Sequence, residues 1–211
     1  LEGNRYVSGV VNYLIARIFS LNNQFDKTLV YLEKAIKGGI EKPDVEKMYD
    51  LDTDESLLNW KSDYVFKIAG HHGFVKFNDG KLITINGNIT GGHFTIDMTT
   101  IENVDGGYNE GLVSHLKNED FFDIYKYPTA YIEFTNVVYN KSINEHLIDA
   151  MLTIKDVSKP IKFTAKADGT NNTMTARFKI DRSRWQINYN HDLKDSTISE
   201  AVEFNVYLKF K

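Results

Sequence analysis

The chain has 211 residues, with 25 basic and 29 acidic side chains and a formal net charge of −4. This mildly acidic balance, without any basic run, argues against a protein that binds nucleic acid. The chain has no cysteine, which excludes disulfides, thiol catalysis and thiolate metal sites, and its longest apolar runs are too short for a membrane span.

The first predicted domain, residues 1–51, is a helical hairpin. Apolar side chains recur at helical spacing on both sides of Asn22 and Asn23, and Gly38 and Gly39 are typical of a helix end. Four side chains are expected to bury against one another: Leu14, Ile18, Leu29 and Leu32. The remaining apolar surface is expected to dock on a protein partner, in the simplest case a second copy. The chain begins at Leu1 without methionine, so we allow for a removed signal peptide.

The hairpin resembles one tetratricopeptide repeat. Small and aromatic residues fall at the positions of that repeat: Ala16, Phe19, Phe25, Leu32 and Ala35. It departs from the repeat at Thr28, where a small residue is usual, and at Ile40, where a proline is usual. A plain helical hairpin is an equal alternative. Because a single repeat cannot bury both of its faces, both interpretations predict a partner.

The second predicted domain, residues 52–211, is a mainly β domain. One helical turn is predicted just before it, at residues 45–48, and from Trp60 onward the hydrophobic period changes to two. The clearest strand alternates apolar with polar side chains from Val202 to Phe210. Each such strand has one apolar and one polar face, which is typical of antiparallel sheets. Turns are predicted at residues 78–80, 86–87, 91–92, 158–160 and 168–169.

Many hairpins in sequence favour an up-and-down antiparallel barrel of about eight strands over a sandwich. A short inserted helix, residues 111–117, is expected to carry His115. Phe121 and Phe122 follow it. We expect one of them to enter the core and the other to border an entrance.

Six blocks of this domain, in order, resemble the YceI-like family. They are Trp60, GHHG at 70–73, GGHFTIDM at 91–98, HLKNEDFFDIYKYPTA at 115–130, AMLTIKDVSKPIKF at 150–163 and IDRSRWQINYN at 180–190. Ala150 and Asp156 stand where the family usually has glycine. The resemblance implies an extended lipocalin-like barrel that binds a long isoprenoid or similar lipid without a reaction. It also implies export to the periplasm and a homodimer.

The predicted lipid-binding residues share the apolar phase of their strands or lie at the expected entrance. They are Phe94, Ile96, Met98, Phe121, Phe122, Ile132, Phe134, Leu152, Ile154, Phe163, Phe178, Val206 and Leu208. A barrel of about eight strands is just wide enough to be filled by side chains or to hold one small ligand. The alternative is therefore a solid barrel that recruits a protein through the helical hairpin.

Two polar clusters offer other chemistry. His71, His72 and Asp97 are candidates for a metal site or for a small-molecule enzyme, although adjacent histidines on a strand point to opposite faces. Arg182, close to Asp181, either binds an anionic head group or forms an ion pair at the barrel rim. No phosphate loop or nucleophile elbow is present, so we expect no enzyme, no metal and no cofactor, apart from a bound isoprenoid-type lipid.

Overall fold

The computed structural model describes residues 11, 12, 14–16, 18, 25–37, 45–64, 70–106, 109–187 and 198–211. Contacts divide the chain into two compact units, Leu1–Val45 and Glu46–Lys211. Strand β1, Glu46–Asp50, belongs to the second unit, where it pairs with residues 81–85 of strand β3. The helical turn predicted at residues 45–48 is therefore wrong. Whether either unit folds alone stays a prediction.

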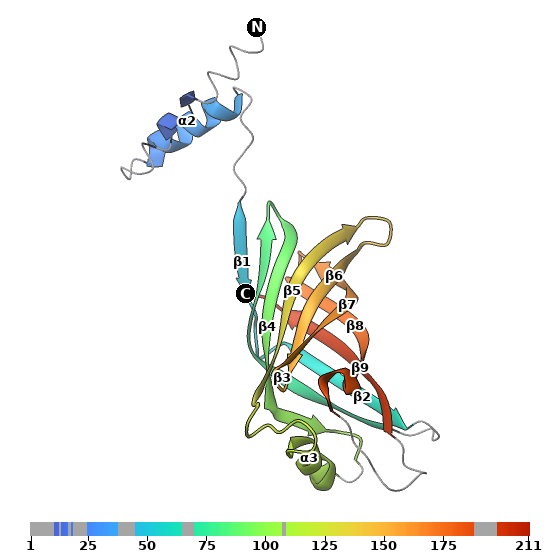
Figure 1. Ribbon diagram of the computed structural model, residues 1–211. Helices are drawn as coiled ribbons and strands as arrows, with labels where there is room; N and C mark the ends of the chain where they lie inside the picture. The colour runs from blue at the N-terminus through green and yellow to red at the C-terminus, as the bar shows by residue number, and fades with distance from the viewer. Residues whose placement is uncertain are drawn as a thin grey trace. The chain divides into compact units, whose positions relative to one another are not determined.

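The described residues of the first unit are helical, apart from Val45 at its end (Figure 1). Residues 11, 12, 14–16 and 18 are helical, and helix α2 spans Phe25–Lys37. Lys34 and Lys37 lie in the last turn of α2, where basic side chains favour the helix dipole.

The apolar residues of this unit are buried differently from the prediction. Leu14, Ile18 and Leu29 are 52%, 57% and 62% exposed, while Ala16 and Ala35 are each 1% exposed. The expectation that Leu14, Ile18, Leu29 and Leu32 bury against one another is wrong, because the first three are exposed and only Leu32 is half-buried. The buried stripe of α2 runs through Leu32 and Ala35, three residues apart, and Leu29 falls outside it. Phe19, Gly38, Gly39, Ile40 and the side chain of Phe25 lie outside the described residues, so the tetratricopeptide resemblance stays a prediction.

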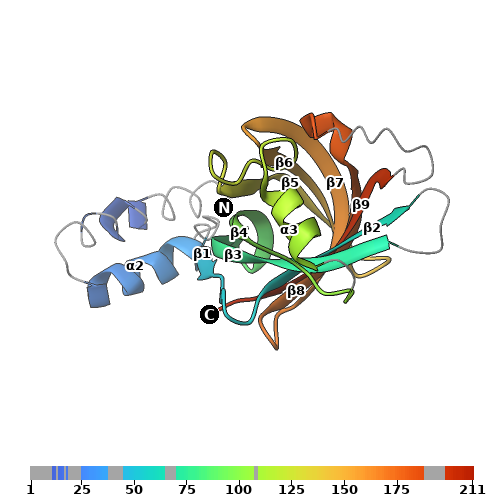
Figure 2. The same ribbon diagram turned by 90° about the horizontal axis from the view of Figure 1, so that it is seen from below.

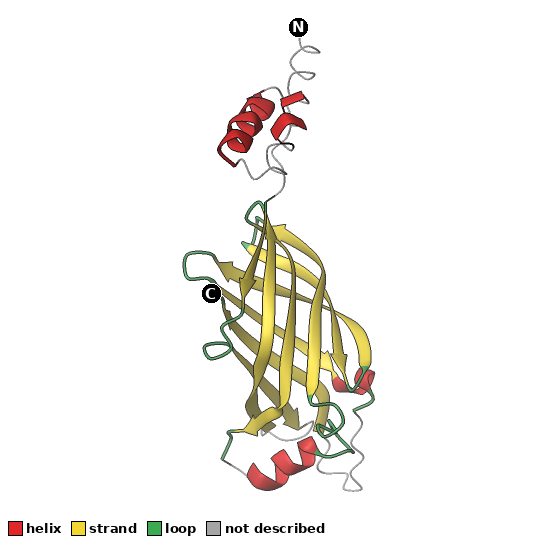
Figure 3. Ribbon diagram, turned by 90° about the vertical axis from the view of Figure 1, so that its left-hand side faces the viewer, coloured by secondary structure: helices red, strands yellow, loops and turns green. Residues whose placement is uncertain are grey.

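The second unit is a closed antiparallel barrel, as predicted (Figures 1 and 3). Its eight wall strands are β2 Leu57–Tyr64, β3 Gly70–Ile85, β4 Asn88–Asn103, β5 Thr129–Asn140, β6 Glu145–Ile154, β7 Val157–Asp168, β8 Thr173–Asp181 and β9 Ile198–Lys209. The order runs β3-β2-β9-β8-β7-β6-β5-β4, and β4 pairs back onto β3. The 16-residue β3 pairs with β2 along its first part and with β1 along its last part.

Two short helices complete the barrel. Helix α3, Asn109–Lys117, lies across the lower end between β4 and β5, and it confirms the predicted inserted helix (Figure 2). The 3₁₀ helix η1, Arg182–Trp185, follows β8. β7 and β8 pair only through residues 165–168 and 173–176. The side chains of η1 bond to the neighbouring wall. The Trp185 indole donates to the Leu152 carbonyl at 2.9 Å, and Arg184 donates to the Pro160 carbonyl at 2.7 Å.

The predicted turns are partly correct. Asn86 and Gly87 have φ values of 52° and 81° and join β3 to β4, and a turn follows Asp168. The turns predicted at residues 78–80, 91–92 and 158–160 are wrong because these residues lie inside β3, β4 and β7. Inside β3, Gly80 makes space for the Phe94 ring and does not form a turn, because a Cβ on Gly80 would lie 2.4 Å from that ring.

Candidate ligand-binding site

The barrel interior holds an apolar cavity. Because side chains alternate along each strand, one phase of every wall strand points inward. The cavity is lined by 31 residues and has a volume of about 150 Å³, taken as the space that the centre of a water molecule can occupy. The gaps between side chains and the open solvent at the mouth bring the total empty space to about 1440 Å³. An apolar cavity of this size can stay dry and hold an apolar molecule.

The structure brings all thirteen predicted lipid-binding residues onto this lining. They are Phe94, Ile96, Met98, Phe121, Phe122, Ile132, Phe134, Leu152, Ile154, Phe163, Phe178, Val206 and Leu208. Their contact with a lipid stays a proposal. The sequence reasoning left out lining residues from β2, from the first half of β3 and from α3, among them Leu58, Val75 and Leu116. The alternation in β2 is the signal that could have identified Leu58.

A row of phenylalanine rings surrounds the cavity. Phe94 and Phe134 have ring centroids 5.5 Å apart, and Phe134 and Phe163 are 6.0 Å apart. Phe163 stacks on Phe178 at 4.7 Å, and Phe178 lies 5.4 Å from Phe204. These rings come from β4, β5, β7, β8 and β9, so they join most of the barrel wall into one aromatic surface. Offset and edge-to-face ring pairs of this kind add to the stability that burial alone provides.

The segment after α3 covers one end of the cavity. Phe121 is buried, and Phe122, half-buried, meets it edge-on at 4.9 Å. The Lys155 ammonium holds the segment by donating to the Phe121 carbonyl at 2.8 Å. His115 of α3 lies 5.8 Å from the Phe121 ring.

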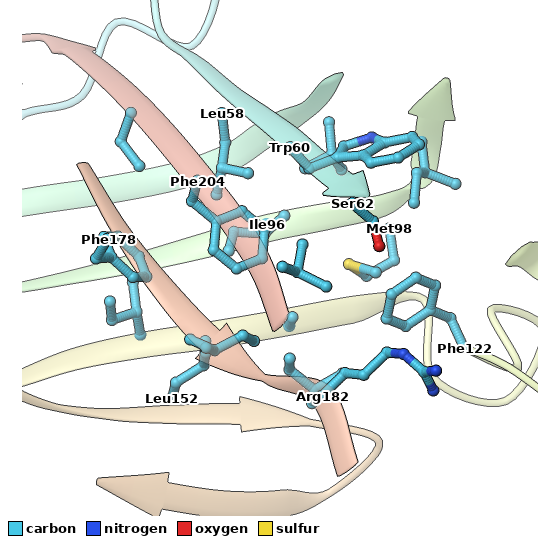
Figure 4. A pocket seen from close by; sticks show the side chains of 18 of the residues that line it. Leu58, Trp60, Ser62, Ile96, Met98, Phe122, Leu152, Phe178, Arg182 and Phe204 are labelled. Carbon is cyan, nitrogen blue, oxygen red and sulfur yellow. The ribbon is translucent and has the colours of Figure 1, made fainter. Parts of the chain in front are cut away.

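The polar side chains of the lining gather at this same end. They are Ser62, His71, His115 and Arg182. Ser62 is the cross-strand partner of both His71 and Val202, and Val202 is the partner of Ile180, two residues before Arg182. Figure 4 shows Ser62 and Arg182 coming from two walls toward Phe122. The polar side chains of the described lining are therefore confined to the α3 end, while nearly all of the surface that faces the cavity is apolar.

Arg182 is the most deeply buried of these groups, at 6% exposed. Its guanidinium donates to the Ile187 carbonyl, donates at 3.4 Å to the Ser199 carbonyl, and lies 5.7 Å from the Phe121 ring centroid. Burial lowers the pKa of Arg182, while Glu200 and Asp181 raise that pKa through their charge.

The ion pair considered for Asp181 and Arg182 does not form. Asp181 instead caps η1, because its carboxylate accepts from the Ser183 amide at 2.9 Å and from the Ser183 hydroxyl at 2.6 Å. No described carboxylate lies within ion-pair distance of Arg182.

The three residues of the enzyme hypothesis do not come together. The His71 ring nitrogen Nδ1 lies 2.7 Å from Asp105, a residue that the sequence reasoning missed, and His72 is exposed. Asp97 is opposite Lys76 and accepts from the Thr99 hydroxyl at 2.6 Å. Among the described residues, no three His, Asp or Glu side chains are placed to hold a metal ion. No described helix has the length and apolar character to cross a membrane.

Comparison with known proteins agrees with this architecture. The model of the YceI-like domain matches residues 49–210. BcnA of Burkholderia cenocepacia has a solved structure that aligns over 75% of this chain and 98% of its own, with a TM-score of 0.62 and 17% identity. A YCEI protein of Campylobacter jejuni is 20% identical over 59% of this chain and 74% of its own, with a TM-score of 0.45. No curated protein matches the sequence. Since the domain model spans more than half of the chain and BcnA shares the barrel fold, this protein belongs to the YceI-like family.

Proposed function

We propose that this protein binds one long apolar lipid, of the isoprenoid type, inside the barrel and carries it without changing it chemically. The observation that supports this most is the continuous apolar lining, from which only Ser62, His71, His115 and Arg182 depart among the described residues. Burial of each CH₂ group of a bound chain is worth about 0.8 kcal/mol. A chain laid along the aromatic row would therefore gain affinity with its length.

The non-catalytic part of the proposal rests on the separation of the candidate catalytic groups. His72 is exposed, and Asp97 is held by Thr99, so neither is aimed at the lining where His71 lies. Away from the α3 end, the described lining also lacks the donors and charges that most reactions need around the reacting atoms. Binding and release are what such a cavity can do best.

A partner at the helical unit is a second proposal, with its own observation. Leu14, Ile18, Leu29 and Val30 are exposed on the unit that contains α2. Large apolar side chains exposed on so small a unit favour a contact surface. We propose that a second copy of the chain covers them and that the dimer works in the periplasm, as the family resemblance implies. Light scattering of the native chain and of a Leu14→Asp, Leu29→Asp variant tests the dimer, which only the variant should lose.

The lipid proposal is tested by what the purified protein contains. The protein is extracted with organic solvent, and the extract is analysed by mass spectrometry. Recovery of a stoichiometric isoprenoid or similar long-chain lipid supports the carrier function. The delipidated protein is then incubated with several lipids and purified again. If it binds none of them, the barrel behaves as solid and the carrier function fails.

A further inference from the structure

The α3 end of the cavity has buried donor groups with unused hydrogen-bonding capacity. The Ser62 hydroxyl oxygen is buried and has no hydrogen-bond partner among the described residues. A guanidinium has five N–H donors, and among the described residues Arg182 donates to two acceptors, the Ile187 and Ser199 carbonyls. Both side chains line the cavity. Buried polar groups in proteins are normally satisfied, so a ligand is expected to supply the missing partner.

The chemistry of these groups limits what that partner can be. A guanidinium has donors only and stays protonated in proteins, so a group that meets Arg182 must accept hydrogen bonds. No described carboxylate forms an ion pair with the buried Arg182, although Glu200 and Asp181 act on it through their charge, and a bound anion would offset the remaining cost of burying the cation. Charge-assisted pairs between arginine and carboxylate or phosphate are among the strongest hydrogen bonds that proteins form.

From this we infer that the bound lipid carries an anionic oxygen group, a carboxylate or a phosphate ester, at the end that lies against Arg182 and Ser62. The inference rests on the proposed lipid-carrying function and adds the lipid's chemical class and its direction in the barrel. Figure 4 shows both side chains beside Phe122, with Phe178, Phe204 and Leu152 farther along the cavity. The head group therefore lies under α3, and the tail runs toward the phenylalanine row.

The direction agrees with the distribution of polarity in the lining. The four polar lining residues are at the α3 end, and none of the other described lining residues carries a charge. A tail-first lipid places its charge where Arg182 can bind it. A head-first lipid would bury an uncompensated charge among aromatic rings, which is far less favourable.

The test uses the full chain after delipidation, with Nile red as a neutral probe of the cavity. Nile red is displaced by a matched isoprenoid series: phytanic acid, phytanyl phosphate, phytol and phytanylamine. We expect the acid or the phosphate to bind about tenfold more tightly than the alcohol and the amine. A hydrogen bond to a charged group contributes enough binding free energy for a change in Kd of about that size. The tighter of the two anions identifies the head group as carboxylate or phosphate.

Variants connect the selectivity to the two residues. Arg182→Met should remove the preference for the anionic probes, and Ser62→Ala should reduce it several-fold. Ser62→Ala also keeps the test valid if Arg182→Met does not fold, since it deletes one hydroxyl. The control is Thr84→Val, because the Thr84 hydroxyl is also buried without a partner but does not line the cavity. It should leave the selectivity unchanged.

The outcomes separate this inference from the function on which it rests. If Nile red enters and the four probes displace it equally, the head-group inference is overturned and the carrier function stands. The same holds if Ser62→Ala and a folded Arg182→Met both keep the full preference. If neither Nile red nor any probe binds, the carrier function fails, and the head-group inference fails with it.

Discussion

Filling the cavity with one large side chain is expected to block lipid binding while the barrel keeps its stability. Ile132 of β5 and Leu152 of β6 are cross-strand partners, and both line the cavity. Ile132→Trp or Leu152→Trp would place an indole ring in the space that we assign to the lipid tail. Tyr131→Trp is the matched control, because Tyr131 precedes Ile132 on the same strand and is exposed.

The size of the effect on stability and on lipid affinity depends on the empty space inside the barrel. In a solid barrel, an extra ring overpacks the core at a cost of about 1–3 kcal/mol. For a protein of this size, that cost lowers the melting temperature by roughly 2–4 °C per kcal/mol. In an open barrel the ring enters empty space, so the melting temperature should change by less than about 2 °C. If the ring displaces about four CH₂ groups of the tail, binding loses about 3 kcal/mol, more than a hundredfold in affinity.

The assay measures Nile red or phytanic acid binding and thermal unfolding by circular dichroism on the same samples. Lost binding with an unchanged melting temperature is the expected result for both lining variants, and native behaviour is expected for Tyr131→Trp. The reasoning is refuted if the lining variants melt much lower while the parent protein itself binds no lipid.

Three further predictions concern the fold. A truncated chain of residues 46–211 should fold alone. A chain of residues 56–211 should melt at a lower temperature, because it lacks β1. Circular dichroism that shows the 46–211 chain to be unfolded would contradict the first expectation. Burial lowers the pKa of His146 from its ordinary value, so the unfolded chain binds this proton more readily than the folded one. The free energy of unfolding should therefore fall as the pH drops below about 6.5. Urea unfolding at a series of pH values should show a smaller fall for His146→Gln. An unchanged dependence on pH would exclude His146 as the cause. Gly73→Ala should destabilise the barrel by about 1–3 kcal/mol or more, because its Cβ would lie 1.7 Å from the Glu102 carbonyl oxygen. Urea unfolding should show no such loss for Gly169→Ala, where a Cβ meets nothing within 4 Å.

The wall strands could be predicted from sequence because register and burial are linked. A slip of one residue would turn every apolar side chain of a strand outward, so alternation alone identifies the inward face. This is why the eleven predicted residues on wall strands reach the lining, whereas Phe121 and Phe122 lie in the segment after α3. Strand β1 could not be predicted in this way, because five residues carry too little periodicity to distinguish a strand from a helical turn.

The helical unit and the polar end of the cavity show where sequence reasoning fails. A helix with several apolar stripes does not reveal which stripe is covered, and the structure buries Ala35 rather than Leu29. The burial of Arg182 depends on Phe121 and Ser199, which lie on other segments, and on Ile187, five residues farther along the chain. No local pattern around Arg182 indicates the contacts with Phe121 and Ser199, so the sequence favoured an ion pair at the rim over a head-group site.

The position of β1 affects how molecules of this protein behave beside one another. Within the described sheet, β1 is the end strand, and its outer edge has no strand neighbour. Open edges are where strands of other molecules add and where aggregation begins. This edge is five residues long, and Glu46, Lys47 and Asp50 are exposed on it. Short length and mixed charge make it a poor template, so β1 shields the second half of β3 from edge-to-edge polymerisation.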